Sequence, residues 1–207
     1  MKTFMLHLIR NASTPANEEG RYLGHTDEAL SRRGLEELEY LTTQAQYPEA
    51  AVVFTSPLLR CTQTAKIIFP NQNPLVLNEL IEINLGEFDG KTAAELEAYP
   101  TFADWLGGKP GLAPPFGESN EEFGRRICGI FEKIVEGIVK SSTKSCAIVT
   151  HSGLITAWLA IYGLPEAPMN DWLCPPGQGY SLRIMPSLWM KAKKLEVTQS
   201  IPIFKSE

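Results

Sequence analysis

The sequence has no long hydrophobic run and no cluster of basic residues. Its apolar runs are too short to span a membrane, and the first of them lacks the length and the cleavage site of a secretion signal. Lysine and arginine number 19 against 24 aspartates and glutamates, for a net charge of −5, and nowhere do they form the basic face of a nucleic-acid-binding domain. We therefore expect neither a membrane nor a nucleic acid as a partner.

Cysteine is also scarce, and no two cysteines are closely spaced. The chain has four, at Cys61, Cys128, Cys146 and Cys174, and Cys128 and Cys146 stand among apolar neighbours. This spacing favours buried free thiols over a disulfide framework or a zinc site. Free thiols are typical of a reducing compartment, so we expect a cytoplasmic location.

The 207 residues are 43% hydrophobic and 21% charged, and they show no linker or internal repeat. A chain of this size buries enough apolar surface to fold without metals or disulfides. We expect one domain over residues 1–207.

Short apolar segments alternate with amphipathic ones along this chain. The apolar segments predict buried strands at 3–9, 50–57, 74–77 and 145–150, and two further strands at 180–185 and 194–199. The segments between them predict helices at 31–45, 58–69, 92–98, 119–140 and 153–163. Such alternation predicts a three-layer α/β/α domain with a mostly parallel central sheet.

Helix starts and loops are marked by individual residues. Ser31 is a candidate N-cap, Ser119 and Glu122 match a capping box, and Pro57 suits the first turn of the helix that follows it. Residues 10–30 and 79–90 predict loops. Residues 99–118 contain four prolines, which predicts a long irregular, lid-like excursion.

Polar side chains follow three of the predicted strands. Arg10 and Asn11 follow the first. The second is followed by Thr55, Ser56 and then Arg60, and the strand at 145–150 by His151 and Ser152. Ligands of parallel sheets bind beyond the carboxyl ends of the strands, so we expect these residues to meet there. Two guanidinium groups beside an imidazole suit the oxygens of a phosphate group.

Several motifs in order resemble those of the histidine phosphatase superfamily, which is also called phosphoglycerate-mutase-like. Where that family has Arg-His-Gly-x-Thr after its first strand, this chain has Arg10-Asn11-Ala12-Ser13-Thr14, and Asn17 matches the family's downstream asparagine. The other matching segments are "GHTDEALSRRG", "SPLLRCTQTA", "LIEINLGEFDG", "PPFGES" and "VTHSGLI". The resemblance covers nearly the whole chain and implies a phosphoglycerate-mutase-like fold.

The resemblance also implies a mechanism that uses a phosphohistidine and needs neither metal nor cofactor. It assigns phosphate binding to four residues, Arg10, Asn17, Arg60 and His151. His151 would also stabilise the transition state, and Glu82 would be the general acid and base. The position of the nucleophilic histidine is occupied by Asn11. The implied ligand is a small phosphorylated metabolite or inorganic phosphate.

Four further residues are candidates for the substrate rim, namely Ser13, His25, Phe102 and Trp105. Each has a structural alternative: Ser13 as a loop cap, His25 as a solvated loop residue, and the two aromatics as packing between the lid and the domain. His7 lies within the first predicted strand, and this position indicates a role in the core or at an interface.

Two interpretations of Asn11 stay open. It is either a single natural or introduced substitution in a working phosphatase, or the mark of a natural protein that binds phosphate ligands without cleaving them. The short chain resembles the phosphatase branch, which includes the α-ribazole phosphatases, more than the longer phosphoglycerate mutases. The strands near the C-terminus leave two alternatives open. They either pair across a homodimer or are covered by the tail "SIPIFKSE".

Overall fold

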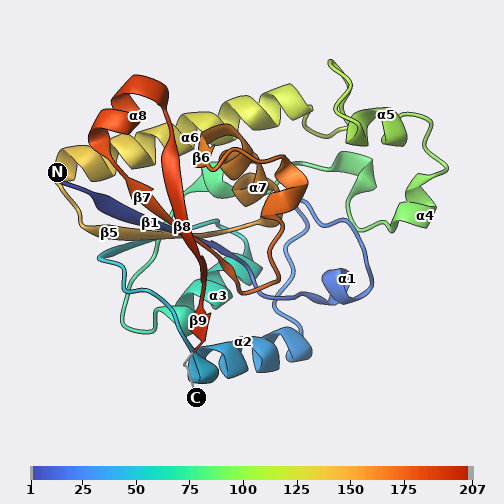
Figure 1. Ribbon diagram of the computed structural model, residues 1–207. Coiled ribbons are helices and arrows are strands. Elements are labelled where there is room, and N and C mark those ends of the chain that lie inside the picture. Colours follow the sequence, from blue (N-terminus) through green and yellow to red (C-terminus); the bar gives the residue numbers. More distant parts are fainter. Residues whose placement is uncertain (1, 205–207) are drawn as a thin grey trace.

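A computed structural model describes residues 2–204 of the chain, and its centre is a seven-stranded sheet (Figure 1). The strand order is β4-β3-β5-β1-β7-β8-β6. The strands are β1 (Phe4–Arg10), β3 (Val52–Thr55), β4 (Leu75–Val76), β5 (Ser145–Thr150), β6 (Gly163–Leu164), β7 (Gly179–Ile184) and β8 (Leu195–Ile201). Only β7 runs against the common direction, since it pairs antiparallel with both β1 and β8. The prediction of a mostly parallel sheet is confirmed.

Helices cover both faces of this sheet. Figure 1 shows α2 (Arg32–Gln44) and α3 (Leu59–Ile68) on one side. The other side carries α6 (Asn120–Ser141), α7 (Ser152–Tyr162) and α8 (Pro186–Ala192). The molecule is therefore the three-layer α/β/α domain that the alternation of segments predicts.

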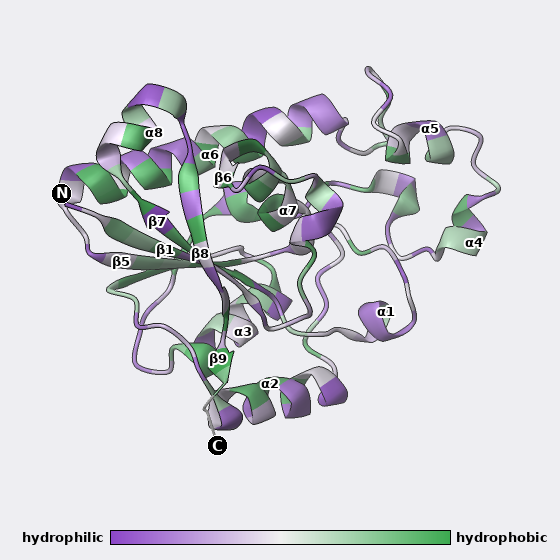
Figure 2. Cartoon of the chain, in the orientation of Figure 1, coloured by the Kyte–Doolittle hydropathy of each residue, from purple (hydrophilic) through white to green (hydrophobic). Residues whose placement is uncertain are grey.

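The larger apolar core lies between the sheet and α6, α7 and α8. There Phe131 stacks on Trp158, with ring centroids 4.7 Å apart, and Leu6 and Leu8 of β1 pack into the same cluster. Ile9 faces the smaller core beneath α3. Because β1 is buried on both faces, its sequence is apolar except at His7 and at Arg10, its last residue, and Figure 2 shows the central strands mostly in the hydrophobic colour.

Two helices begin where capping residues predict. The Ser31 side chain accepts a hydrogen bond from the Gly34 N–H at 2.8 Å, ahead of α2. Ser119 and Glu122 form a complete capping box ahead of α6. The expectation for Pro57 is wrong, because α3 begins two residues later, at Leu59.

The segments predicted as loops contain short helices. Residues 10–30 include α1 (Pro15–Glu18), and residues 99–118 include α5 (Phe102–Leu106). The other short helices are α4 (Ala93–Leu96) and the 3₁₀ turns η1 (Asn78–Leu80), η2 (Gly86–Phe88) and η3 (Met169–Trp172). The helix predicted at 92–98 is confirmed by α4, whereas α1 and α5 were missed, because helices of four or five residues leave little periodicity in a sequence.

The C-terminal strands are adjacent and antiparallel, with α8 between them in sequence. The outer edge of β8 is partly paired with β6. Beyond β8, β9 (Ile203–Phe204) pairs with β2 (Ala45–Gln46) in a separate two-stranded sheet, while the rest of the tail lies outside the described residues. A homodimer stays a prediction. No helix within residues 2–204 is long and apolar enough to cross a membrane.

Candidate active site

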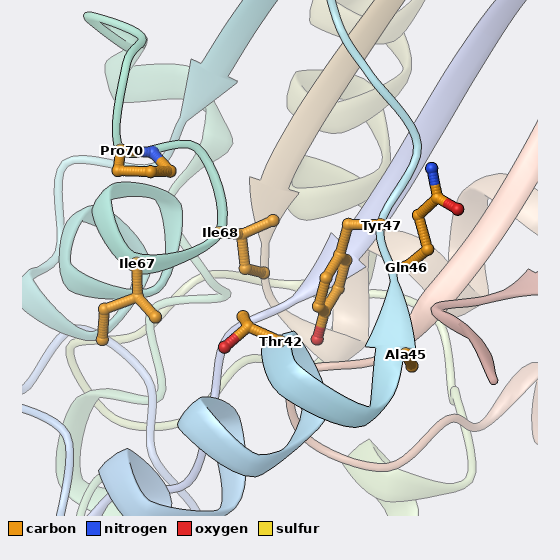
Figure 3. A pocket seen from close by; sticks show the side chains of 7 residues that line it. All are labelled: Thr42, Ala45, Gln46, Tyr47, Ile67, Ile68 and Pro70. Atoms are coloured by element: carbon orange, nitrogen blue, oxygen red, sulfur yellow. The ribbon is translucent and has the colours of Figure 1, made fainter. Parts of the chain in front are cut away.

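One cavity, of about 440 Å³, opens between the C-terminal ends of α2 and α3 (Figure 3). Its lining residues are Thr42, Ala45, Gln46, Tyr47, Ile67, Ile68 and Pro70. None of them carries a charge at neutral pH, and the Tyr47 hydroxyl already donates to the Gly177 carbonyl at 2.7 Å. This cavity offers no cation to an anionic ligand.

A second cavity, of about 310 Å³, lies at the carboxyl edge of the sheet. Its lining residues are Arg10, Asn11, Asn17, Arg21, Tyr22, Leu23, Arg60, Glu82, His151 and Ser152. The loops after β1, β3 and β5 adjoin because β5 lies between β3 and β1 in the sheet. All six residues to which the sequence assigns catalysis or phosphate binding therefore line one cavity.

Asn11 is held firmly at the end of β1. Its backbone N–H donates to the Thr150 carbonyl at 2.8 Å, and the Gly177 N–H lies 3.1 Å from the Arg10 carbonyl and 3.3 Å from that of Asn11. Its side-chain nitrogen Nδ2 donates to the Ala12 carbonyl at 2.9 Å. The Asn11 side chain is therefore fixed by its own loop before any ligand binds.

Arg60 enters the cavity from the first turn of α3 and is only 2% exposed. Its guanidinium donates to the carbonyls of Gly24, at 2.7 Å, and Thr26, at 2.9 Å. Its Nε donates to His151 Nδ1 at 3.3 Å. Because all these acceptors are neutral, the buried positive charge of Arg60 is not balanced by them.

Arg10 adds a second cation at the end of β1. Its Nη1 donates to the Cys174 carbonyl at 2.7 Å, again a neutral acceptor. Within residues 2–204, the ion pairs involve neither Arg10 nor Arg60. Glu82 attracts both guanidinium groups only at longer range, and two shielded guanidinium groups without a direct ion pair favour the binding of an anion between them.

His151 follows β5 and is 2% exposed. Burial, with Arg60 as the next cause, holds the pKa of His151 well below its ordinary value, so the ring is neutral at physiological pH. Since Nδ1 accepts from Arg60, the ring proton is on Nε2, which donates to Ser56 Oγ at 2.8 Å. His151 thus brings one N–H to the cavity wall, and in this structure that N–H is donated to Ser56.

Glu82 places its carboxylate against the start of α7. One oxygen accepts from the Ile83 N–H at 2.9 Å and the other from the Gly153 N–H at 3.1 Å. Burial raises the pKa of Glu82, while these two N–H groups and Arg60 oppose the shift. A carboxyl group whose pKa is raised holds its proton at higher pH, as a general acid must.

Asn17 belongs to α1 and forms a capping box with Thr14. Its side-chain oxygen accepts from the Thr14 N–H at 3.2 Å, and its own N–H donates to Thr14 Oγ1 at 3.4 Å. This pairing uses the amide oxygen of Asn17. The amide nitrogen is the group left to donate to a ligand in the cavity.

Ser152 lines the cavity beside His151, as expected for residues that follow β5, whereas three lining residues were not predicted from the sequence: Arg21, Tyr22 and Leu23. Arg21 differs from the other two arginines, since it pairs with Glu19 at 2.7 Å and Glu95 at 3.0 Å. The signal for residues 21–23 was their position between Asn17 and Gly24, inside one loop of the phosphate site.

The four rim candidates do not line this cavity. Phe102 and Trp105 are buried, and each packs on Phe88 with ring centroids 5.6 Å apart. These two aromatics therefore have the structural role that was the alternative to a place on the substrate rim. His25 Nε2 donates to the Glu82 carbonyl at 2.9 Å, and the Ser13 carbonyl accepts from the Ser31 N–H at 3.0 Å.

In the described part of the chain, no three His, Cys, Asp or Glu side chains gather in a way that could hold a metal ion. Cys61 Sγ lies 3.5 Å from His151 Nε2, but burial raises the pKa of this thiol. All four cysteines are free. The charged groups available for chemistry are the arginines and Glu82.

Comparisons with known proteins agree with this geometry. The model of the histidine phosphatase superfamily (branch 1) matches residues 6–192. Phosphoserine phosphatase 1 of Hydrogenobacter thermophilus is 32% identical over 71% of this chain and 70% of its own length. The adenosylcobalamin/α-ribazole phosphatase of Escherichia coli is 27% identical over 79% and 82%.

The fold also matches a solved structure over almost its full length. The α-ribazole phosphatase of Shigella flexneri superimposes with a TM-score of 0.79 at 22% identity, covering 98% of this chain and 96% of that one. This likeness shows the fold, and the family match over residues 6–192 shows the family. The chain belongs to the histidine phosphatase superfamily.

Proposed function

We propose that the cavity at the carboxyl edge binds small phosphomonoesters and that the parent form of this protein hydrolyses them through a phosphohistidine. In the present sequence Asn11 occupies the position of the nucleophile. Asn11 cannot attack phosphorus, so hydrolysis is strongly impaired while binding is retained. Arg10, Asn17, Arg60 and His151 hold the phosphate, and Glu82 acts on the leaving oxygen.

The hydrogen bond from Asn11 Nδ2 to the Ala12 carbonyl carries this proposal. The side-chain nitrogen of asparagine and Nδ1 of histidine stand at the same distance along the side chain from Cβ. A histidine at position 11 can therefore donate from Nδ1 to the same carbonyl. Its Nε2 would then carry the free lone pair and face the cavity, as a nucleophile requires.

The reaction of that parent form balances without a metal. Nε2 of the histidine attacks phosphorus, the bond from phosphorus to the ester oxygen breaks, and Glu82 gives its proton to the leaving oxygen to form an alcohol. Water then attacks the phosphohistidine and gives a proton to Glu82, which releases phosphate and restores the nitrogen. Arg10, Arg60 and His151 stabilise the charge on the phosphoryl oxygens in both steps.

The size and charge of the cavity limit the ligand. A volume of about 310 Å³ accommodates a phosphate group and a small alcohol. Inorganic phosphate and small phosphorylated metabolites of the cytoplasm fit these limits. The absence of a nucleophile at position 11 also fits a natural non-catalytic binder of the same ligands, and a phosphoglycerate mutase is a third, weaker candidate.

The unpaired charges of the site favour the phosphatase over an old non-catalytic binder. Clustered positive charge destabilises a fold in the absence of its ligand, yet Arg10 and Arg60 both stay without a carboxylate partner. Asn17, Glu82 and His151 are retained as well. In a site that lost catalysis long ago, we would not expect the proton donor Glu82 to be kept beside the phosphate-binding groups.

The substitution Asn11→His tests this proposal. We expect hydrolysis of p-nitrophenyl phosphate to rise by about 10⁶-fold, the cost of losing the nucleophile in another covalent catalyst. We also expect an acid-labile phosphoenzyme after rapid quenching. Asn11→Gln is the matched control, because it changes the same side chain without adding a nucleophile.

A folded Asn11→His protein that binds phosphate but shows no hydrolysis and no phosphoenzyme would support the non-catalytic binder. Isomerisation of phosphoglycerate that depends on a bisphosphate primer would support the mutase. A panel of phosphate esters on the active variant then identifies the preferred alcohol.

A further inference from the structure

Glu118 and Arg126 form a shielded ion pair beside the segment that carries Glu82. Arg126 Nε donates to one carboxylate oxygen of Glu118 at 2.9 Å, and Nη2 donates to the other at 2.7 Å. The two side chains are only 14% and 21% exposed. Two parallel hydrogen bonds of this kind fix the plane of the guanidinium as well as its position.

The remaining donors of this guanidinium hold the backbone around Glu82. Nη1 donates to the carbonyls of Glu79, at 2.9 Å, and Ile81, at 2.8 Å, and Nη2 donates to that of Glu82 at 3.2 Å. Arg126 therefore contacts three carbonyls within four residues of chain. Its own helix, α6, is anchored in the core by Ile127 and Phe131.

Glu118 holds the other end of the same segment. Its Oε2 accepts from the Asn84 N–H at 3.3 Å, and its own N–H donates to the Asn84 carbonyl at 2.8 Å. Residues 79–84 are thus held on both sides of Glu82. We call Glu118 and Arg126 together the clamp.

We propose that the clamp positions the Glu82 carboxylate for proton transfer, with Arg126 as the positioning residue and Glu118 as its support. This inference rests on the proposed function, in which Glu82 is the general acid. Neither clamp residue lines the cavity, so neither touches the phosphate. The clamp contacts the backbone that carries Glu82, and the charge of Arg126 additionally lowers the pKa of the Glu82 carboxyl, an effect that a lysine at position 126 retains.

The geometry at Glu82 explains why such positioning matters. Its two oxygens meet two separate N–H groups, those of Ile83 and Gly153, which lie in different segments. The bond to Ile83 lies within this segment, whereas the bond to Gly153 persists only while residues 79–84 keep their place relative to α7. A shift of about 1 Å in a catalytic group can lower a rate by about 100-fold.

The substitution Arg126→Lys keeps the positive charge but removes the planar fork, so it tests position rather than charge. We would make it in the Asn11→His background and measure kcat/KM for two esters. An alkyl phosphate needs proton donation to its leaving oxygen, whereas p-nitrophenyl phosphate has a leaving group that departs without it. We expect the ratio of alkyl to aryl kcat/KM to fall by about 10- to 100-fold, within the usual contribution of a general acid.

Arg125→Lys is the matched control, because the neighbouring Arg125 is exposed. It should leave the ratio unchanged. Glu118→Gln, which removes the support but not the fork, should lower the ratio less than Arg126→Lys. An unchanged ratio in both clamp variants, or an equal loss with both esters, would overturn the proposal.

A second measurement does not depend on catalysis. In the original chain carrying Asn11, Arg126→Lys should speed the hydrogen exchange of the Gly153 amide, whose N–H donates to Glu82. The affinity for inorganic phosphate should stay the same. If Asn11→His proves inactive, the proposed function fails while exchange at Gly153 still decides the clamp. Unaltered exchange in both clamp variants would refute it.

Discussion

Gly153 and Glu82 lie so close together that residue 153 cannot carry a side chain without moving the carboxylate. The Gly153 N–H donates to Glu82 Oε2 at 3.1 Å. A Cβ atom at position 153 would stand 2.5 Å from Oε1. The glycine after His151 and Ser152 is therefore required by a carboxylate that lies 71 residues earlier in the chain.

The substitution Gly153→Ala should separate catalysis from stability. The atom that the new methyl group meets is at the end of a flexible side chain, so Glu82 can rotate away at little cost. Alanine also suits the first turn of α7, and we expect the free energy of unfolding to change by less than about 1 kcal/mol. The displaced carboxyl group can no longer protonate the leaving oxygen, so alkyl phosphate turnover in the Asn11→His background should fall by about tenfold or more.

Urea unfolding and the two-ester assay would check this pair of expectations. Gly129→Ala in α6 is the control, because a Cβ at that position meets nothing within 4 Å. A large loss of stability with unchanged proton donation would show that the Gly153 contact is structural only.

The second prediction concerns the charges that hold phosphate. Arg60→Ala should weaken the binding of inorganic phosphate by about 10- to 100-fold, because it removes a hydrogen bond to a charged group, which is worth about 1.5–3 kcal/mol. His151→Ala should weaken binding less, since its neutral ring carries a single N–H, which has to leave Ser56 before it can donate to phosphate. Isothermal titration of the chain that carries Asn11 measures both affinities without turnover.

Arg33→Ala is a suitable control for the loss of an arginine, because Arg33 is 73% exposed and pairs with Glu37. Circular dichroism would establish that each variant is folded. If phosphate bound equally well to both Arg60→Ala and His151→Ala, the assignment of the cavity would be wrong.

The sequence predicts the part of the site that depends on local signals. Apolar runs locate β1 and β5, so Arg10, Asn11 and His151 fall at strand ends without knowledge of the fold. The positions of Arg60 and Glu82 follow from their motifs. Convergence of these residues then follows from one rule, that parallel strands present their carboxyl ends at the same edge.

The parts that sequence reasoning missed depend on contacts between distant segments. Arg126 reaches a carbonyl 44 residues earlier, and nothing in the local pattern of α6 distinguishes it from its exposed neighbour Arg125. Phe102 and Trp105 were candidates for the rim because aromatics in a lid often face ligands. Their burial depends on contacts with Phe88, which belongs to a different segment of the chain.

His7 shows that a histidine in this family is not always catalytic. It lies in β1 away from the cavity, with Nδ1 2.8 Å from Ser181 Oγ and Nε2 3.2 Å from Ser145 Oγ. Ser145 donates its own proton to the Glu49 carbonyl, so its oxygen accepts from Nε2, and Nδ1 accepts from Ser181. This arrangement suits the neutral ring, and burial lowers the pKa of His7 to about 4.

The stability of the protein should therefore depend on pH through His7. Between pH 6.5 and about 4 the unfolded chain binds a proton at this residue that the folded chain does not. The free energy of unfolding should then fall as the pH drops through this range, with His7 contributing about 3 kcal/mol of the loss. His7→Gln keeps a donor and an acceptor for the two serines but cannot titrate, so its stability should decline less steeply over the same range. Urea unfolding at a series of pH values compares how steeply the free energy of unfolding falls with pH in the two proteins. Equal slopes would show that the pKa of His7 does not differ between the folded and the unfolded chain.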